Sequence, residues 1–296
     1  MAGRSAPGSG SASSGLPFLA LVRPANGLIA GAAVAVGALV ARRPPAAGPV
    51  LLGALAAFAA AAGANALNDV VDARADAVNR PGRPVPSGTV GRRAALSVAV
   101  LGYAAAIALG FAVGPAAGGL ALAWVVVTAL YSLALKGTPI VGNVTVAAVA
   151  ASPLLMGGLS QRAAGPTLVP CALAFLAHLA REIVKDVEDM AGDRAAGVRT
   201  TAVALGAESA LGMVRVVVVL LMGAAVVPFA VGLFGWGYAA LVVVIDALLV
   251  VVLGAAGRGA EAASLRRGSL LLKTVMVVGL LAFALGVLGR SPGEGA

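Results

Sequence analysis

The sequence predicts an all-helical membrane protein, a bundle of nine transmembrane helices. Hydrophobic residues make up 60% of the 296 residues and charged residues only 11%, whereas soluble domains carry about 25% charged residues. Apolar runs of about 20 residues, long enough to cross a bilayer as helix, recur along the chain. The runs are rich in Ala and Gly and do not alternate polar with apolar residues, which favours closely packed helices over membrane strands. A soluble enzyme, a disulfide-framed domain and a disordered chain are thereby excluded.

The two ends of the chain differ from the rest. Residues 1–15 are rich in Gly, Ser and Ala and are predicted to form a disordered tail. One transmembrane domain is expected over residues 16–290, followed by a short tail over 291–296. The single cysteine and single histidine give no basis for a thiolate or histidine-rich metal centre.

The nine predicted spans follow one another with short connections. They cover residues 16–41, 50–68, 94–114, 116–135, 140–159, 167–183, 209–231, 236–253 and 270–288. The segments after the second, fourth, sixth and eighth spans hold 14 Lys and Arg residues, and the segments on the other side hold four. The positive-inside rule therefore predicts a cytoplasmic N-terminus and an external C-terminus in the cell membrane. Since basic residues set topology here, the net charge of +9 does not indicate nucleic acid as a partner.

Acidic residues are concentrated at two places. Eight of the twelve lie in the stretches 69–76 and 182–193, after the second and sixth spans. Both stretches contain the spacing D-x-x-D-x-x-x-D, first as Asp69, Asp72 and Asp76, then as Asp186, Asp189 and Asp193. Two copies of one pattern, 117 residues apart, indicate an internal repeat of a functional unit.

The spacing of these acids indicates a metal site. Positions i, i+3 and i+7 share one face of a helix, so each motif is expected to form a carboxylate stripe. An apolar bundle cannot neutralise two such stripes, but Mg²⁺ can, and it commonly bridges one or two carboxylates to substrate phosphates. Solvated loop acids are the alternative for a single motif, and the repeat argues against it. The motifs therefore suggest a site at the cytoplasmic rim for a Mg²⁺-bound diphosphate.

Basic residues follow each acidic motif. Arg80 and Arg83 lie in a Pro- and Gly-containing loop after the first, and Arg194 and Arg199 follow the second. Arginine can bind phosphate through two parallel hydrogen bonds. The alternative is that these arginines only set the membrane topology and have no role in binding. Together with the acids they suggest that phosphate and metal are held at one site.

The chain resembles the UbiA superfamily of intramembrane prenyltransferases. Its first signature, N-D-x-x-D-x-x-x-D, is met by the residues from Asn68 to Asp76. Its second, D-x-x-x-D followed by G-x-[KR]-[ST], is met by Asp189, Asp193, Gly197, Arg199 and Thr200. The likeness covers nearly the whole chain. Within the superfamily it is greatest to the digeranylgeranylglyceryl phosphate synthases, the archaeal-type ether-lipid enzymes, over residues 79–88, 135–143 and 181–193.

The resemblance implies transfer of an isoprenyl group, here geranylgeranyl, from its diphosphate donor to a lipophilic acceptor, with membrane lipid around the protein. It implies two Mg²⁺ ions and a set of metal ligands, namely Asn68, Asp69, Asp72, Asp76, Asp186, Asp189 and Asp193. It gives candidate substrate contacts, namely Arg23, Asn26, Arg83, Lys136, Lys185 and Arg199. Asp72, Asp76, Asp189 and Asp193 are expected to be catalytic, and Tyr131 is expected to face the allylic cation. The expected acceptor is geranylgeranylglyceryl phosphate, whose own phosphate is assigned to Arg23.

Other functions are consistent with parts of the pattern. Within the enzyme class, the alternative acceptor is an aromatic quinone precursor or a chlorophyll-like molecule. A secondary transporter also has many spans and repeats, but its binding site usually lies near the bilayer midplane. A purely structural membrane protein leaves the repeated acids unexplained.

Two charges lie inside predicted spans and outside the motifs. Arg215 is in the seventh span and Asp246 near the middle of the eighth. An ionisable group at such depth costs about 3 kcal/mol or more unless it is paired. The sequence therefore predicts a structural ion pair between Arg215 and Asp246.

Overall fold

The computed structural model describes residues 16–257, 259 and 261–289, so both predicted tails lie outside the described residues. Within this part of the chain every regular element is a helix, and nine helical segments are long and apolar enough to cross a membrane. The predicted all-helical class is confirmed.

Helical elements follow one another with few long loops between them. The first half of the described chain comprises α1 Leu16–Val22, α2 Pro24–Ala41, α3 Ala47–Val71, α4 Ala73–Asn79, α5 Arg92–Val113, α6 Pro115–Leu130 and the π-helical turn η1 Tyr131–Leu135. The second half comprises α7 Val141–Ala151, α8 Pro153–Ser160, the 3₁₀ turn η2 Gly165–Thr167, α9 Leu168–Ala196, α10 Thr201–Leu205, α11 Ala207–Ala230, α12 Trp236–Gly257 and α13 Ala262–Leu288.

The ninth predicted span begins too late, since its helix α13 starts at Ala262 and not at residue 270, and three further spans also differ in detail from the observed helices. The first is broken at Arg23, whose left-handed backbone (φ 50°) separates α1 from α2, and Pro24 starts the new helix. The fifth is divided where α7 gives way to α8 at Ser152, before Pro153. The sixth does not end at residue 183 but continues as α9 to Ala196. A hydropathy pattern misses this extension because residues 182–196 are helical but polar.

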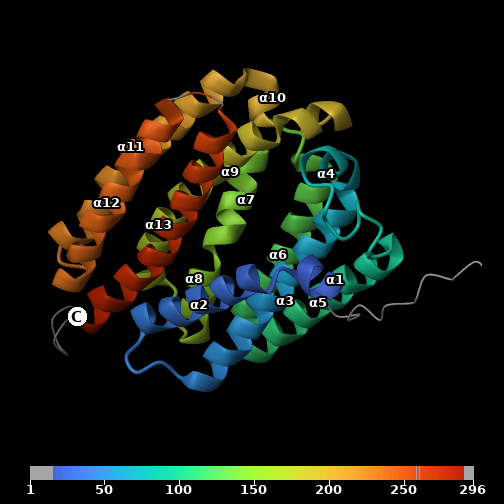
Figure 1. The fold of residues 1–296 in the computed structure, drawn as a ribbon. Helices are drawn as coiled ribbons and strands as arrows, with labels where there is room; N and C mark the ends of the chain where they lie inside the picture. Colours follow the sequence, from blue (N-terminus) through green and yellow to red (C-terminus); the bar gives the residue numbers. More distant parts are fainter. Residues whose placement is uncertain (1–15, 258, 260, 290–296) are drawn as a thin grey trace, which may run out of the picture.

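The two ends of the bundle carry different elements (Figure 1). The α2–α3 loop, α8 and the end of α13 lie at one end, whereas α4, α10 and the junction of α12 with α13 lie at the other. At this second end α9 packs against both α4 and α10. Since α4 and the polar part of α9 carry the two acidic motifs, the fold brings the motifs together at one end.

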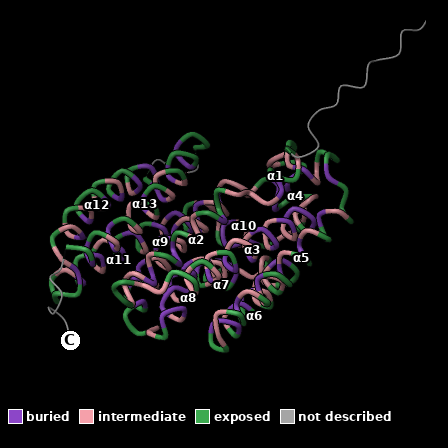
Figure 2. Tube along the Cα trace, turned by 90° about the horizontal axis from the view of Figure 1, so that it is seen from below, coloured by how far each residue is buried: buried purple, intermediate pink, exposed green. Residues whose placement is uncertain are grey.

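Packing divides the bundle into two parts. One buried cluster joins α9, α11, α12 and α13 through large residues such as Leu211, Leu249 and Leu272. Another joins α2, α3, α5, α6 and α8, mainly through alanines, which allow helix backbones to approach closely. Large apolar side chains also cover the outward faces, for example Leu101 and Val243, which are 69% and 71% exposed. Figure 2 shows such exposed positions along the peripheral helices, as expected for a multi-pass protein surrounded by lipid.

The predicted pair between Arg215 and Asp246 is wrong. The Arg215 guanidinium donates to the carbonyl oxygen of Ala256 at 2.9 Å, near the end of α12. Asp246 makes no ion pair within the described residues, and its Oδ1 is buried without a hydrogen-bond partner. The long Arg215 side chain therefore finds its hydrogen-bond acceptor at the end of α12, where backbone carbonyls are free, and not in the middle of that helix, where Asp246 lies.

Candidate active site

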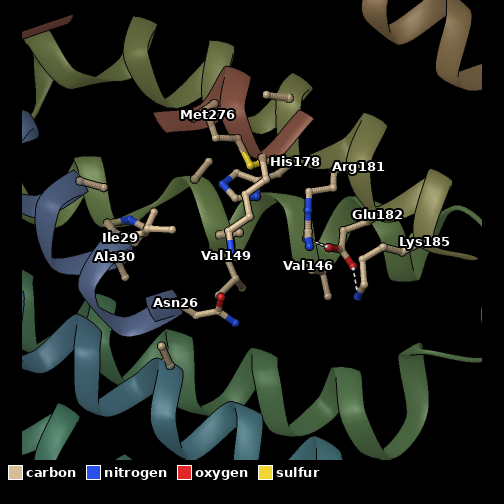
Figure 3. A pocket seen from close by; sticks show the side chains of 18 of the residues that line it. Asn26, Ile29, Ala30, Val146, Val149, His178, Arg181, Glu182, Lys185 and Met276 are labelled. Carbon is tan, nitrogen blue, oxygen red and sulfur yellow. Dashed lines mark hydrogen bonds and ion pairs between the residues drawn. The ribbon is translucent and has the colours of Figure 1, made fainter. Parts of the chain in front are cut away.

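A cavity of about 600 Å³ lies between the two parts of the bundle. Seven acidic and seven basic side chains line it, together with the apolar side chains of Trp124, Leu154, Leu173, Val242 and Phe283. The acidic and basic residues are Asp72, Asp76, Glu182, Asp186, Glu188, Asp189, Asp193, Arg23, Arg80, Arg83, Lys136, Arg181, Lys185 and Lys273. Figure 3 shows part of this lining, with Asn26 of α2 opposite Arg181 and Lys185 of α9.

The first acidic motif does not lie on one continuous helix. α3 ends at Val71, Asp72 has a non-helical backbone (φ −83°, ψ 3°), and α4 begins at Ala73. The three carboxylates therefore do not form the single stripe that the spacing predicts. Each of them has a different nearest basic partner: Arg23 for Asp69, Lys136 for Asp72 and Arg83 for Asp76.

Asp69 is fully buried behind the cavity. Its Oδ1 pairs with the guanidinium of Arg23, and Arg83 lies 3.7 Å away. Arg23 also donates to the side chain of Asn65. The left-handed backbone of Arg23, which is rare for a non-glycine residue, occurs at the break that brings this side chain to the cavity. Asp69 does not itself line the cavity, so it serves to fix Arg23 and Arg83.

Asp76 of α4 is also buried, and its Oδ2 pairs with Arg83. Its Oδ1 lies 3.7 Å from Arg80, one turn further along the chain. Asp72 pairs with Lys136 at 2.6 Å. The first motif thus faces the cavity through two carboxylates, each beside a cation.

The second acidic motif lies on α9 and is linked to the first by Arg80. Arg80 reaches Asp189 with two bonds, Nη2 to Oδ1 at 2.7 Å and Nη1 to Oδ2 at 2.9 Å. Burial lowers the pKa of Arg80, but Asp189 and Asp76 outweigh that effect and raise it, so the guanidinium stays charged. This bidentate bond aligns the two motifs.

The approach of α4 to α9 depends on a glycine. A Cβ added at Gly192 would lie 2.5 Å from the carbonyl oxygen of Ala75, so a larger residue would push the helices apart. At this crossing Asn79 accepts the Gly192 N–H at 2.9 Å and donates to the carbonyl of Asp189 at 2.8 Å. Gly192 and Asn79 therefore set the distance between the two motifs.

Asp186 is held by its neighbours. Asn143 of α7 donates to its Oδ2 at 2.9 Å, and the backbone N–H of Thr201 donates at 3.2 Å. The hydroxyl of Thr201 donates in turn to Asn143. Asn143 thus makes an interhelical hydrogen bond between α7 and α9.

The end of α6 contributes polar groups to the opposite wall. Tyr131 and Ser132 begin the π-helical turn η1, a form that is frequent at functional sites, and both line the cavity. The Ser132 hydroxyl donates to Asn68 and also bonds the carbonyl of Thr128 at 2.9 Å. Asn68 is therefore oriented with its side chain at the cavity wall.

Most of the predicted site residues gather in the cavity, namely Arg23, Asn26, Asn68, Asp72, Asp76, Arg83, Tyr131, Lys136, Lys185, Asp186, Asp189 and Asp193. Arg199 does not, because it lines a separate pocket of about 430 Å³ that also borders Asp72 and Lys136. The list of predicted site residues does not contain Arg181, Glu182, Glu188 and Lys273, which also line the cavity, and Arg80 is predicted only as one of the basic residues near the phosphate. Arg80 stands out in the sequence as an arginine four residues after Asp76, whereas Lys273 carries no local signal.

The carboxylates of the cavity are better suited to bind Mg²⁺ together with a diphosphate than to bind Mg²⁺ by themselves. Within the described residues no three His, Cys, Asp or Glu side chains form a ready-made metal site, and several of the acids, such as Asp72 and Asp189, are paired with cations. Mg²⁺ usually keeps several waters and needs only one or two carboxylates besides phosphate oxygens. Asn68, Asp72, Asp76, Asp189 and Asp193 offer such oxygens around one cavity. With acids and bases in equal number, a metal–diphosphate complex adds far less net charge than diphosphate alone.

Comparisons with known proteins identify a family and a fold. The sequence profile of the UbiA prenyltransferase family matches residues 29–270. The digeranylgeranylglyceryl phosphate synthase of Methanopyrus kandleri is 38% identical over 266 residues, which cover 90% of this chain and 97% of that protein. The enzyme of the same name from Halobacterium salinarum is 39% identical over 275 residues, covering 90% of this chain and 98% of that one.

Solved structures share the fold. A structure described as that of a digeranylgeranylglyceryl phosphate synthase superposes with a TM-score of 0.75 at 26% identity, covering 94% of this chain and all of the other. A UbiA homologue from Archaeoglobus fulgidus, bound to GPP and Mg²⁺, superposes with a TM-score of 0.68 at 18% identity, covering 93% of this chain and all of that one.

Proposed function

The chain belongs to the UbiA prenyltransferase family, and we propose that it transfers a geranylgeranyl group from its diphosphate to geranylgeranylglyceryl phosphate. The product is digeranylgeranylglyceryl phosphate, an ether lipid. The observation that carries the proposal is the convergence of both acidic motifs and their basic partners on one cavity with apolar deeper walls. The names of the relatives at 38% and 39% identity support this choice of acceptor.

The reaction breaks the allylic C–O bond of the donor and forms a C–O bond to the acceptor hydroxyl. Diphosphate leaves with the bonding electrons, and the hydroxyl proton is released with it. The protein must therefore stabilise negative charge on the leaving group while shielding the allylic cation from water. Mg²⁺, when bound with the diphosphate, would supply positive charge there.

Individual roles follow from the positions of the side chains. We assign Asn68, Asp72, Asp76, Asp189 and Asp193 to hold the metal–diphosphate complex, with Asp69 and Asp186 as supports held by their hydrogen bonds. Two Mg²⁺ ions suit this number of oxygen donors. Arg83 and Lys136, each already beside a carboxylate, would turn to the phosphate oxygens. Tyr131 would present its ring to the cation.

We also propose that the end of the bundle with the acidic motifs faces the cytoplasm. The segments at this end hold 14 of the basic residues counted above, and the opposite segments hold four. The N-terminus is then cytoplasmic and the C-terminus external. A cysteine-accessibility assay in intact cells, on single cysteines placed at Arg93 and Gly48, tests this orientation.

One experiment tests the activity. Purified protein in detergent is incubated with Mg²⁺ and geranylgeranyl diphosphate against phosphoglyceryl, aromatic and chlorophyll-like acceptors, and product masses are measured. Digeranylgeranylglyceryl phosphate is the expected product. Alkylation of only an aromatic or chlorophyll-like acceptor would overturn the acceptor assignment. Uptake of solute that depends on an ion gradient, without prenyl transfer, would favour a transporter.

A further inference from the structure

One wall of the cavity carries basic residues that form no ion pair with the aspartates of the acidic motifs. Arg181 and Lys185 project from α9 into the cavity, as Figure 3 shows. Lys273 lines the same cavity from α13, and Ser269 lies one helical turn before it. Since α9 packs directly against α13, these side chains belong to one surface, here called the α9–α13 wall.

The partners of these residues leave the wall with excess positive charge. Glu182, the single acidic residue between Arg181 and Lys185, lies 3.1 Å from Arg181 and 3.6 Å from Lys185. Lys273 has no ion pair or hydrogen bond within the described part of the chain. The Nε of Arg181 is buried and also lacks a partner among these residues. The three cations of the wall therefore share one ion-paired carboxylate, that of Glu182, while the neighbouring Asp186 accepts hydrogen bonds from Asn143 and Thr201.

Arg23 is less suited to a second ligand. Its guanidinium is already paired with Asp69 and bonded to Asn65. Arg83 and Arg80 are likewise engaged with the motif carboxylates. Lys273, the one basic residue of the described cavity lining without an ion pair, thus lies on the α9–α13 wall and not at the acidic motifs.

We propose that Arg181, Lys185 and Lys273 bind the phosphomonoester head group of the acceptor lipid, with Ser269 donating a hydrogen bond. A phosphomonoester carries about −1.5 to −2 charge at neutral pH, which matches the excess on this wall. An aromatic carboxylate would offset only half of that excess, and a neutral ring none. This inference rests on the proposed function and identifies what selects its acceptor.

The position of the wall fits the reaction. Lys185 and Arg181 precede Asp189 by four and eight residues on α9, which is about 6 and 12 Å along the helix axis. That interval leaves room for the reacting allylic carbon and the glycerol carbons between the two phosphates. The acceptor hydroxyl would then lie beside the donor, while its prenyl chain enters the apolar part of the cavity.

The test is a kinetic comparison of Lys273→Met with wild type in detergent, with Mg²⁺ present. Removing one charge-assisted contact should raise the KM for geranylgeranylglyceryl phosphate about tenfold, with the KM for geranylgeranyl diphosphate unchanged within about twofold. The preference for this acceptor over dephosphorylated geranylgeranylglycerol should fall by the same factor. Lys273→Arg should retain most of the preference because it keeps the charge.

Arg267→Gln is the matched control, because Arg267 lies on α13 but is exposed and outside the cavity lining. It should leave both KM values unchanged. The inference is overturned if Lys273→Met, with a wild-type melting temperature, keeps the wild-type acceptor KM, or if donor and acceptor KM rise together. If wild type itself does not alkylate geranylgeranylglyceryl phosphate, the proposed function fails and the inference fails with it.

Discussion

Arg80 holds Asp189 with both ends of its guanidinium, at 2.7 and 2.9 Å, although 109 residues separate them in the sequence. Arg80 follows the first acidic motif and Asp189 belongs to the second. A planar fork that matches a carboxylate fixes both distance and direction. This pair, together with the Gly192–Asn79 contact, aligns the motifs before any substrate binds.

Arg80→Lys tests whether this geometry matters beyond its charge. Lysine keeps the positive charge but cannot make two parallel bonds to Asp189. We expect kcat/KM for the diphosphate donor to fall about tenfold, measured with the acceptor at saturation. Arg93→Lys, at an exposed position on α5, should leave kcat/KM unchanged. An equal change of kcat/KM in both variants would contradict a specific role for the bidentate Arg80–Asp189 interaction.

Asp72→Ala and Asp189→Ala should each reduce kcat about 10²–10³-fold or more. Each removes a carboxylate proposed to bind the metal–diphosphate complex, and loss of such a charge-stabilising group costs on the order of 10²–10³ in kcat. Melting in detergent should change little, because both side chains lie at the cavity and not in the packed core. Glu208→Ala, at an exposed acid of α11, is the control. Wild-type activity in either aspartate variant would refute its assignment.

Removal of divalent metal should also stop the reaction. Without Mg²⁺ the diphosphate adds uncompensated negative charge to a cavity whose acidic and basic residues are equal in number. EDTA should therefore reduce product formation to background, and added Mg²⁺ or Mn²⁺ should restore it. Full activity in EDTA, with metal removal verified by elemental analysis, would exclude a metal-dependent mechanism.

Hydropathy predicts the spans because it reports burial in lipid over about 20 residues. It does not report backbone breaks, so the separation of α1 from α2 at Arg23 and of α3 from α4 at Asp72 is absent from the prediction. It also ends the sixth span early, since α9 continues as a polar helix to Ala196. There, packing against α4 and α10, and not hydrophobicity, stabilises the helix.

The site residues that belong to one short sequence motif can be predicted from the sequence. Asp72 and Asp189 both line the cavity, but which cation each carboxylate contacts depends on helix packing. Arg199 matches the second signature and yet lines the neighbouring pocket, because the chain turns at Gly197 (φ 75°) after α9. Lys273 lies in a distant helix and enters the cavity through tertiary packing alone.

Gly192→Ala should weaken the crossing of α4 and α9. The added methyl would lie 2.5 Å from the Ala75 carbonyl oxygen, so the helices must separate, at a cost of about 1–3 kcal/mol for overpacking. We expect a lower melting temperature in detergent and a loss of activity, because the two motifs move apart. Gly212→Ala is the matched control: Gly212 is also helical, but no atom outside its own stretch of helix lies within 4 Å of the added methyl, and alanine there should be neutral or stabilising.

Asp246→Leu should stabilise the protein. Oδ1 of Asp246 is buried in α12 without a hydrogen-bond partner among the described residues, and an unsatisfied polar group of this kind costs about 1–3 kcal/mol. Leucine removes that cost and suits a helix with lipid beside it. The melting temperature in detergent should rise, whereas Arg215→Met should lower it by removing the bond to the Ala256 carbonyl. Because the two side chains have different partners, the double variant should show additive shifts. A destabilised Asp246→Leu, or strong non-additivity with Arg215→Met, would instead mean that the two charges interact.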